Sequence, residues 1–165
     1  MLKQPSLLLC GLVISLLAGN VYAARVKVIN ADFEQGWYGW KKSGPSAISD
    51  HGRDDESSAK ITGESGRVEQ DVRVKPNTDY TLMAFMKGSG QIGVNTVAEL
   101  TEKQKAVNKF QTLTMKTYSD DDYHPDWEKI TVDFNSGNSD TVTIFAAYED
   151  GTGRFDRFRV LQKRD

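Results

Sequence analysis

Asn30-Ala-Asp-Phe-Glu-Gln-Gly-Trp-Tyr-Gly-Trp40 and Gly153-Arg-Phe-Asp-Arg-Phe-Arg-Val160 are the two stretches from which the architecture of this chain can be worked out. The second stretch alternates like a β-strand, and a strand sends successive side chains to opposite faces. Asp156 is therefore expected on the same side as Phe158 and Val160. A carboxylate among apolar side chains is costly unless it is paired or binds a metal. The closing stretch thus predicts a β-strand with an inward carboxylate that needs a partner.

The chain between these stretches has short alternating segments separated by turn residues, and no long segment keeps a helical period. After Trp127, the apolar side chains of Ile130, Val132 and Phe134 share one side, which is typical of a half-buried antiparallel strand. The pattern predicts an all-β antiparallel sandwich with a loop at 98–108. Strands are expected at 25–30, 37–43, 59–62, 67–74, 79–87, 91–96, 110–118, 127–134, 141–148 and 154–161.

Residues 1–23 have the pattern of an export signal. Lys3 is followed by an apolar run over 7–19, and Val21-Tyr-Ala23 places small residues where a signal peptidase cleaves. The apolar run is shorter than the roughly 20 residues of a membrane-spanning helix, so a retained anchor is the weaker interpretation. We expect cleavage after Ala23, a secreted or periplasmic protein, and a domain at 24–165.

The expected mature chain of 142 residues contains no cysteine, because Cys10 lies in the signal segment. A core or a metal must therefore stabilise it without disulfides. The length fits one domain. Its 20 Lys and Arg against 23 Asp and Glu give a formal charge of −3. This balance provides no electrostatic reason to expect nucleic acid or an anionic membrane as a partner.

The two stretches resemble the opening and the final strand of non-catalytic carbohydrate-binding modules with a galactose-binding-like β-sandwich, or jelly-roll, fold. These modules are relatives of cellulose- and xylan-binding modules. The resemblance implies a structural calcium ion held by Glu34 and Asp156, with backbone carbonyls of the loop 51–57 completing the oxygen ligands that calcium prefers. The alternative is that Glu34 is an exposed turn acid and that Asp156 forms an ordinary ion pair with Arg154 or Arg157.

Sugar-binding side chains are expected where aromatic rings stand beside hydrogen-bonding groups, because sugars combine apolar C–H faces with hydroxyls. The candidates are Trp37, Tyr38, Tyr118, Tyr123 and His124. The alternative is that these residues belong to a solvated loop or to packing. Lys87, Arg157 and Arg159 would form a basic outer face if their strands adjoin. Such a face would suit a uronic-acid polymer, although a plain solvated surface is the alternative.

Two other functional classes remain open. A small polysaccharide lyase or glycoside hydrolase would need converging acid–base groups, and Tyr123 and His124 point oppositely when the chain is extended. The sequence has no nucleophile elbow, zinc-ligand helix or phosphate loop. A protein-binding adhesion or matrix component is the other class. We expect an exported, non-catalytic module whose partner is a polysaccharide or oligosaccharide.

Overall fold

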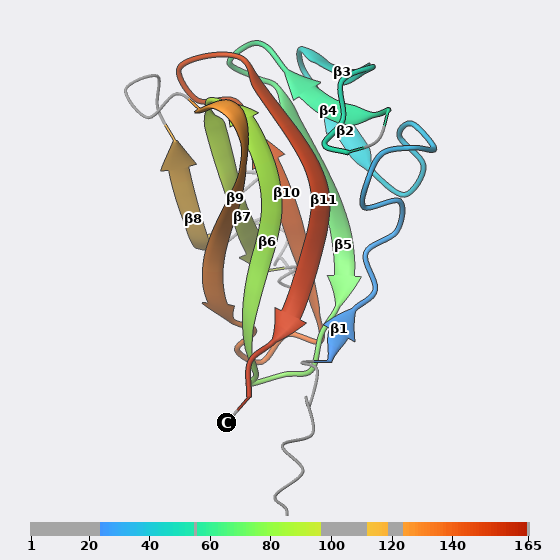
Figure 1. Cartoon of the computed structure of the whole chain (residues 1–165). Helices are drawn as coiled ribbons and strands as arrows, with labels where there is room; N and C mark the ends of the chain where they lie inside the picture. The colour runs from blue at the N-terminus through green and yellow to red at the C-terminus, as the bar shows by residue number, and fades with distance from the viewer. Residues whose placement is uncertain (1–23, 55, 97–111, 119–123, 165) are drawn as a thin grey trace, which may run out of the picture.

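Alternating apolar residues pair into two antiparallel sheets in the computed structural model (Figure 1). The model describes residues 24–54, 56–96, 112–118 and 124–164. The expected signal segment, the loop 98–108 and Tyr123 lie outside the described residues. No helix that could cross a membrane occurs in the described ranges. The strands are β1 (Arg25–Val26), β2 (Lys41–Ser43), β3 (Ser46–Ser49), β4 (Ser58–Ile61), β5 (Arg67–Arg73), β6 (Asp79–Gly88), β7 (Gly90–Thr96), β8 (Thr112–Tyr118), β9 (His124–Asn135), β10 (Thr141–Ala147) and β11 (Gly153–Gln162).

One sheet has six strands, in the order β3-β4-β11-β6-β9, with β1 also paired to β11. The closing strand β11 pairs with β6 along one side. Along its other side, β4 pairs with residues 153–155 and β1 with residues 160–161. The start of the domain therefore lies beside its end (Figure 1). The stretch of β11 between β4 and β1 is left to contacts with loops.

The second sheet has five strands, in the order β2-β5-β10-β7-β8. Its central strands are in close register, with Val142 of β10 opposite Val72 of β5 and Thr96 of β7. Val142, Ile144 and Ala146 are fully buried between the sheets. The other side chains of β10 therefore lie on the outer face of this sheet.

The core combines aliphatic side chains with an aromatic cluster from both ends of the chain. The Trp40 ring lies 4.9 Å from the rings of Phe33 and Phe158, measured between centroids. Trp40 also donates its indole N–H to the carbonyl of Asn30 at 2.9 Å. Buried aromatic pairs of this kind stabilise a fold beyond the area they bury. The predicted β-sandwich is confirmed, and Trp40 is buried in its core.

Two local predictions are wrong. Residues 37–40 form turns and not the start of a strand, because Gly39 has a φ of +81° and the Trp40 N–H bonds to the carbonyl of Trp37 at 2.9 Å. The sequence analysis also missed β3. This four-residue strand follows Gly44-Pro45 and pairs only with β4, so its apolar pattern is too short to stand out.

The inward direction predicted for Asp156 is also wrong. Phe155 lies in the core opposite Met86, so Asp156, the next residue, faces outward opposite Phe85. Between Asp156 and Arg159 a β-bulge inserts one residue, with Arg157 at a φ of +53°. The bulge reverses the alternation, so Phe158 and Val160 return to the core. Asp156 is nevertheless 0% exposed, because a loop covers it.

Candidate functional site

The opening stretch 30–40 lies beside residues 156–159 of β11, which pair with neither β4 nor β1. Phe158 donates its N–H to the carbonyl of Ala31 at 2.9 Å. The Asn30 side chain holds this stretch in tight turns, since its amide donates to the Gly36 carbonyl at 2.8 Å and accepts from the Gln35 N–H at 3.0 Å. These contacts place Glu34 next to the loop 51–57.

Both predicted acids contact this loop. Asp156 accepts the Arg53 N–H through Oδ2 at 2.8 Å and the Arg157 N–H through Oδ1 at 2.6 Å. Glu34 accepts the Ser57 N–H through Oε1 at 2.7 Å. The structure thus brings an exposed and a buried carboxylate to two points of one short loop.

Side chains hold the same loop against the six-stranded sheet. The Arg53 guanidinium lies 3.8 Å above the centroid of the Phe85 ring and pairs with Asp54 at 2.7 Å. Asp54 also lies 3.8 Å from the guanidinium of Arg157. At the other end of the loop, the Ser58 hydroxyl donates to the His51 carbonyl at 2.7 Å. Contacts of Arg53 and Asp54, together with the hydrogen bond between Ser58 and His51, therefore fix the position of the loop.

The donor set at this acid loop, defined as 51–57 with Glu34 and Asp156, fits a hard cation. Within the described residues no three Asp, Glu, His or Cys side chains gather at one point. A cation here would thus be held by two carboxylates and by backbone carbonyls. Calcium accepts such a mixture of oxygen ligands, whereas zinc favours nitrogen and sulfur.

The outer face of the five-stranded sheet carries a second set of polar groups. Register places Arg67 level with Gln91, Glu69 level with Phe145, and Asp71 level with Thr143 and Asn95. Because opposite residues share a face, these side chains project together. We call this surface the β5–β10–β7 face. It consists of Arg67, Glu69, Asp71, Gln91, Asn95, Thr143 and Phe145.

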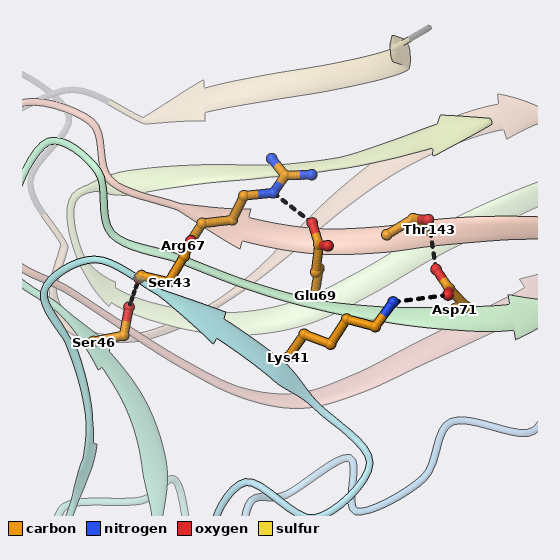
Figure 2. A network of polar contacts seen from close by, with 7 residues as sticks. All are labelled: Lys41, Ser43, Ser46, Arg67, Glu69, Asp71 and Thr143. Atoms are coloured by element: carbon orange, nitrogen blue, oxygen red, sulfur yellow. Dashed lines mark hydrogen bonds and ion pairs between the residues drawn. The ribbon is translucent and has the colours of Figure 1, made fainter. Parts of the chain in front are cut away.

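At one end of this face, Phe145 and Glu69 fix the orientation of the Arg67 guanidinium. The guanidinium lies 3.7 Å above the centroid of the Phe145 ring. The Arg67 Nε donates to Glu69 Oε2 at 2.7 Å (Figure 2). Phe145 is 2% exposed although it faces away from the core. The Nη2 atom of Arg67 is buried and has no hydrogen-bond partner among the described residues. Arg67 Nη2 is therefore a fixed donor that is covered beneath this face and unpaired within the described residues.

At the other end, Asp71 accepts the Thr143 hydroxyl at 2.6 Å and the Lys41 ammonium at 3.2 Å (Figure 2). Asn95 is 5% exposed, and its Oδ1 has no partner within the described part of the chain. Arg67 and Asp71 are four residues apart on β5, which corresponds to roughly 13 Å along a strand. The unused donor and acceptor thus lie toward opposite ends of an elongated polar strip.

Of the sugar-binding candidates in the described part of the chain, Trp37 and Tyr38 lie near β2, and Tyr118 and His124 lie on the edge strands β8 and β9. Trp37 packs against Phe33 with the ring centroids 5.9 Å apart, whereas Tyr38 is 64% exposed. Trp37 also lies 6.0 Å from the Lys42 ammonium, near the β2 edge of the five-stranded sheet. Tyr118 and His124 pair through their backbones with Gly90 and Gly88, at the far edge strands. Tyr123 lies outside the described residues.

The sequence analysis missed the β5–β10–β7 face, although a signal was present. In β10 the residues Val142, Ile144 and Ala146 alternate with Thr143 and Phe145. An aromatic residue on the polar side of an alternating strand indicates a surface with a role in binding. The unpartnered atoms of Arg67 and Asn95 could only be found from the paired strands.

A family of carbohydrate binding domains matches residues 27–151, which is most of the chain. This chain belongs to that family. Exochitinase 1 of Streptomyces olivaceoviridis is 30% identical over 134 residues, a match that covers 76% of this chain and 19% of the exochitinase. The chain thus spans about a fifth of the length of that relative.

Solved structures agree with the sandwich fold of this carbohydrate-binding domain. A CBM4 structure has a TM-score of 0.58 at 15% identity, covering 83% of this chain and 100% of that one. The CBM22-1 xylan-binding domain of Paenibacillus barcinonensis Xyn10C also has a TM-score of 0.58, at 13% identity. That match covers 82% of this chain and 93% of the xylan-binding domain. At such low identities the similarity establishes the fold.

Proposed function

We propose that this domain is exported and binds an extended polysaccharide chain, without cutting it, along the β5–β10–β7 face. The observation that supports this surface is the pair of buried polar atoms, Arg67 Nη2 and Asn95 Oδ1, that lack partners among the described residues. Buried polar groups are nearly always hydrogen-bonded, so an unpartnered donor and acceptor on one face suit a ligand that supplies both. Sugar hydroxyls donate and accept.

The arrangement of the face suits a chain of sugars. The Arg67 guanidinium is oriented before any ligand arrives, because Phe145 and Glu69 hold it. A preoriented donor costs less conformational entropy on binding than a mobile side chain. The strip of roughly 13 Å between its ends exceeds the size of one sugar ring. The similarity to part of an exochitinase makes chitin the first polymer to test, and xylan is the second.

A structural calcium ion at the acid loop and cleavage after Ala23 are parts of the same proposal. The support for calcium is that Glu34, from the start of the domain, and Asp156, from its last strand, contact the same loop. The support for export is the apolar segment over 7–19. The ion would stabilise the domain and would not touch the sugar.

Affinity electrophoresis through gels that contain glycol chitin or soluble xylan tests the proposed surface. The native protein should be retarded by at least one polymer, and Arg67→Lys should be retarded less. Lysine keeps the charge but loses the planar set of donors. Loss of a hydrogen bond to a charged donor costs about 1.5–3 kcal/mol, or roughly a tenfold or larger loss of affinity.

Asn95→Ala separates binding from folding. Removal of an acceptor that has no partner among the described residues should leave the thermal midpoint almost unchanged, while binding weakens. Arg159→Gln, on the outer face of the six-stranded sheet, is the control and should bind like the native protein. Absence of retardation by every glycan would contradict the proposal and favour a protein partner. Release of cleaved sugar would favour the enzyme alternative.

A further inference from the structure

Three cations lie side by side on the outer face of the six-stranded sheet. Arg154 of β11 is directly opposite Lys60 of β4 on one side and Lys87 of β6 on the other. Like charges directly opposite one another destabilise a sheet. Within the described residues none of the three forms an ion pair, and Arg154 donates its Nε to the Ser49 hydroxyl at 3.3 Å. This row is an unfavourable arrangement that an anion would relieve.

A cavity opens beside this row, and its size falls in the range of about 300–1,000 Å³ that is typical of small-ligand pockets. Its volume is about 410 Å³, and its walls are formed by Asp50, His51, Gly52, Lys87, Trp127 and Arg154. We call it the basic cavity. Trp127 lies in β9 at the register shift opposite Met86 and Gly88 of β6, is half-buried and supplies an indole ring. The cavity therefore combines a flat apolar surface with two cations.

Among the described residues that line the basic cavity, Asp50 is the acid, and it already has a partner. Asp50 Oδ1 lies 2.6 Å from His51 Nδ1. The hydrogen bond from His51 is the main cause that lowers the pKa of Asp50, and the positive charge of Arg154 adds a smaller effect. Within the described residues, Asp50 pairs with His51 and forms no ion pair with Arg154 or Lys87. The two cations are thus available to a ligand.

We propose that the basic cavity binds a carboxylate-bearing sugar, such as a uronic acid residue of a polysaccharide. The C–H face of the sugar ring would pack on Trp127, and its carboxylate would accept hydrogen bonds from Arg154 and Lys87. The cavity lies on the opposite sheet from the β5–β10–β7 face, so it is a second site with a different preference. The sequence predicts a basic outer face from Lys87, Arg157 and Arg159 if their strands adjoin. Strands β6 and β11 do adjoin, and the residue directly opposite Lys87 is Arg154.

Isothermal titration calorimetry with short oligogalacturonates tests the second site in the full chain. The native protein should bind them, and the double variant Lys87→Gln/Arg154→Gln should bind at least about tenfold more weakly, because two charged hydrogen bonds are lost. Trp127→Ala should weaken binding to a similar degree. Purely electrostatic attraction between the oligogalacturonate and the cations would not depend on the indole. Equal binding by the native protein and either variant would overturn the proposal.

Matched controls exclude folding and non-specific charge effects. Lys60→Gln removes one charge from the same row without touching the cavity wall, and it should retain most of the affinity. The double variant should unfold at the same temperature as the native protein or higher, since it removes like charges that face each other. Dextran sulfate, which has charge but no carboxylate, should bind independently of Trp127. If oligogalacturonates behave in the same way, the site is only a charged surface and the proposal fails.

The second site can be separated from the proposed neutral site. Asn95→Ala should leave oligogalacturonate binding unchanged, and the Lys87→Gln/Arg154→Gln variant should leave retardation by chitin or xylan unchanged. Competition between xylan fragments and oligogalacturonates would mean that both use one surface, and this would overturn the two-site proposal. Failure of every neutral glycan to bind would affect only the β5–β10–β7 face.

Discussion

At the scale of single residues, Asp133 shows how a surface acid contributes to stability. Its carboxylate accepts the Thr81 hydroxyl at 2.7 Å and the Lys163 ammonium at 2.6 Å. The hydrogen bond from Lys163, followed by that from Thr81, holds the pKa of Asp133 below its usual range. The contribution is present above the usual Asp pKa of about 3.9 and is lost as the pH falls through the lower, folded-state pKa.

Asp133→Asn should therefore lower the free energy of unfolding at neutral pH, by less than about 1 kcal/mol because the pair is exposed. Urea unfolding at pH 7 and at a pH of about 2 measures this. The difference between Asp133→Asn and the native protein should shrink at the acidic pH. Glu64→Gln, at an exposed turn, is the control and should show no such change. A constant difference at both pH values would contradict the prediction.

Asp156 marks the limit of prediction from single residues. The sequence identifies it as a carboxylate that needs a partner, and the structure agrees, with two backbone N–H groups on its oxygens. Its direction could not be predicted, because the bulge depends on Arg157 at a φ of +53°. A glycine would have indicated such a bulge. With an arginine there, simple alternation gives the wrong face.

At the scale of elements, the turn between β6 and β7 depends on one glycine. Gly88 has a φ of +91°, and a Cβ added there would lie 2.1 Å from the carbonyl oxygen of Thr152. Gly88→Ala should lower the free energy of unfolding by about 3 kcal/mol or more, since strain and a backbone clash combine. Gly137→Ala is a matched control. Gly137 also has a positive φ, of +54°, but nothing lies within 4 Å of the added Cβ.

Gly137→Ala should cost only the left-handed backbone conformation, about 1 kcal/mol. Chemical denaturation of the two variants measures the difference. Equal losses would show that the approach of Thr152 to Gly88 does not constrain the turn. Both glycines stand at turns that the sequence indicates, but the difference between them depends on Thr152, a residue just before β11 and far away along the chain.

The elements that sequence predicts best are those with long alternation. The strand at 127–134 was expected from Ile130, Val132 and Phe134, and β9 contains it. The short β3 was missed because two of its four residues are serines and its pairing with β4 is what defines it. Phe145 was overlooked as a surface residue, because only the register with β5 shows that Arg67 lies near its ring.

At the scale of the whole molecule, one loop connects the two proposed sites of the six-stranded sheet. Arg53 and Ser57 of the loop bond to the acids that form the proposed calcium site. His51 and Gly52, at the start of the same loop, line the basic cavity. An ion that orders the loop would therefore also order one wall of the cavity. The β5–β10–β7 face belongs to the other sheet, so its ligand should be less sensitive to that ion.

Calcium should therefore stabilise the whole domain, because it would join the opening stretch, the loop 51–57 and β11. At a concentration of about 100 times the dissociation constant, a ligand that binds only the folded state adds about 2.7 kcal/mol. This corresponds to a rise of roughly 5 to 10 °C in the midpoint of thermal unfolding. Differential scanning calorimetry in calcium and in EGTA measures the shift, and magnesium should not replace calcium, since it demands a tighter octahedral site.

Glu34→Gln is the sharper variant for this test, because Glu34 is exposed while Asp156 is buried and accepts two backbone N–H groups. The Glu34→Gln protein should unfold near the native midpoint in EGTA but should gain little from calcium. Glu64→Gln should respond to calcium like the native protein. Asp156→Asn should be less stable even in EGTA, because its amide presents a donor to a backbone N–H that the carboxylate now accepts. If the native midpoint is the same in calcium and in EGTA, Glu34 and Asp156 act only as acceptors that cap the loop, and the domain is stabilised by its core alone.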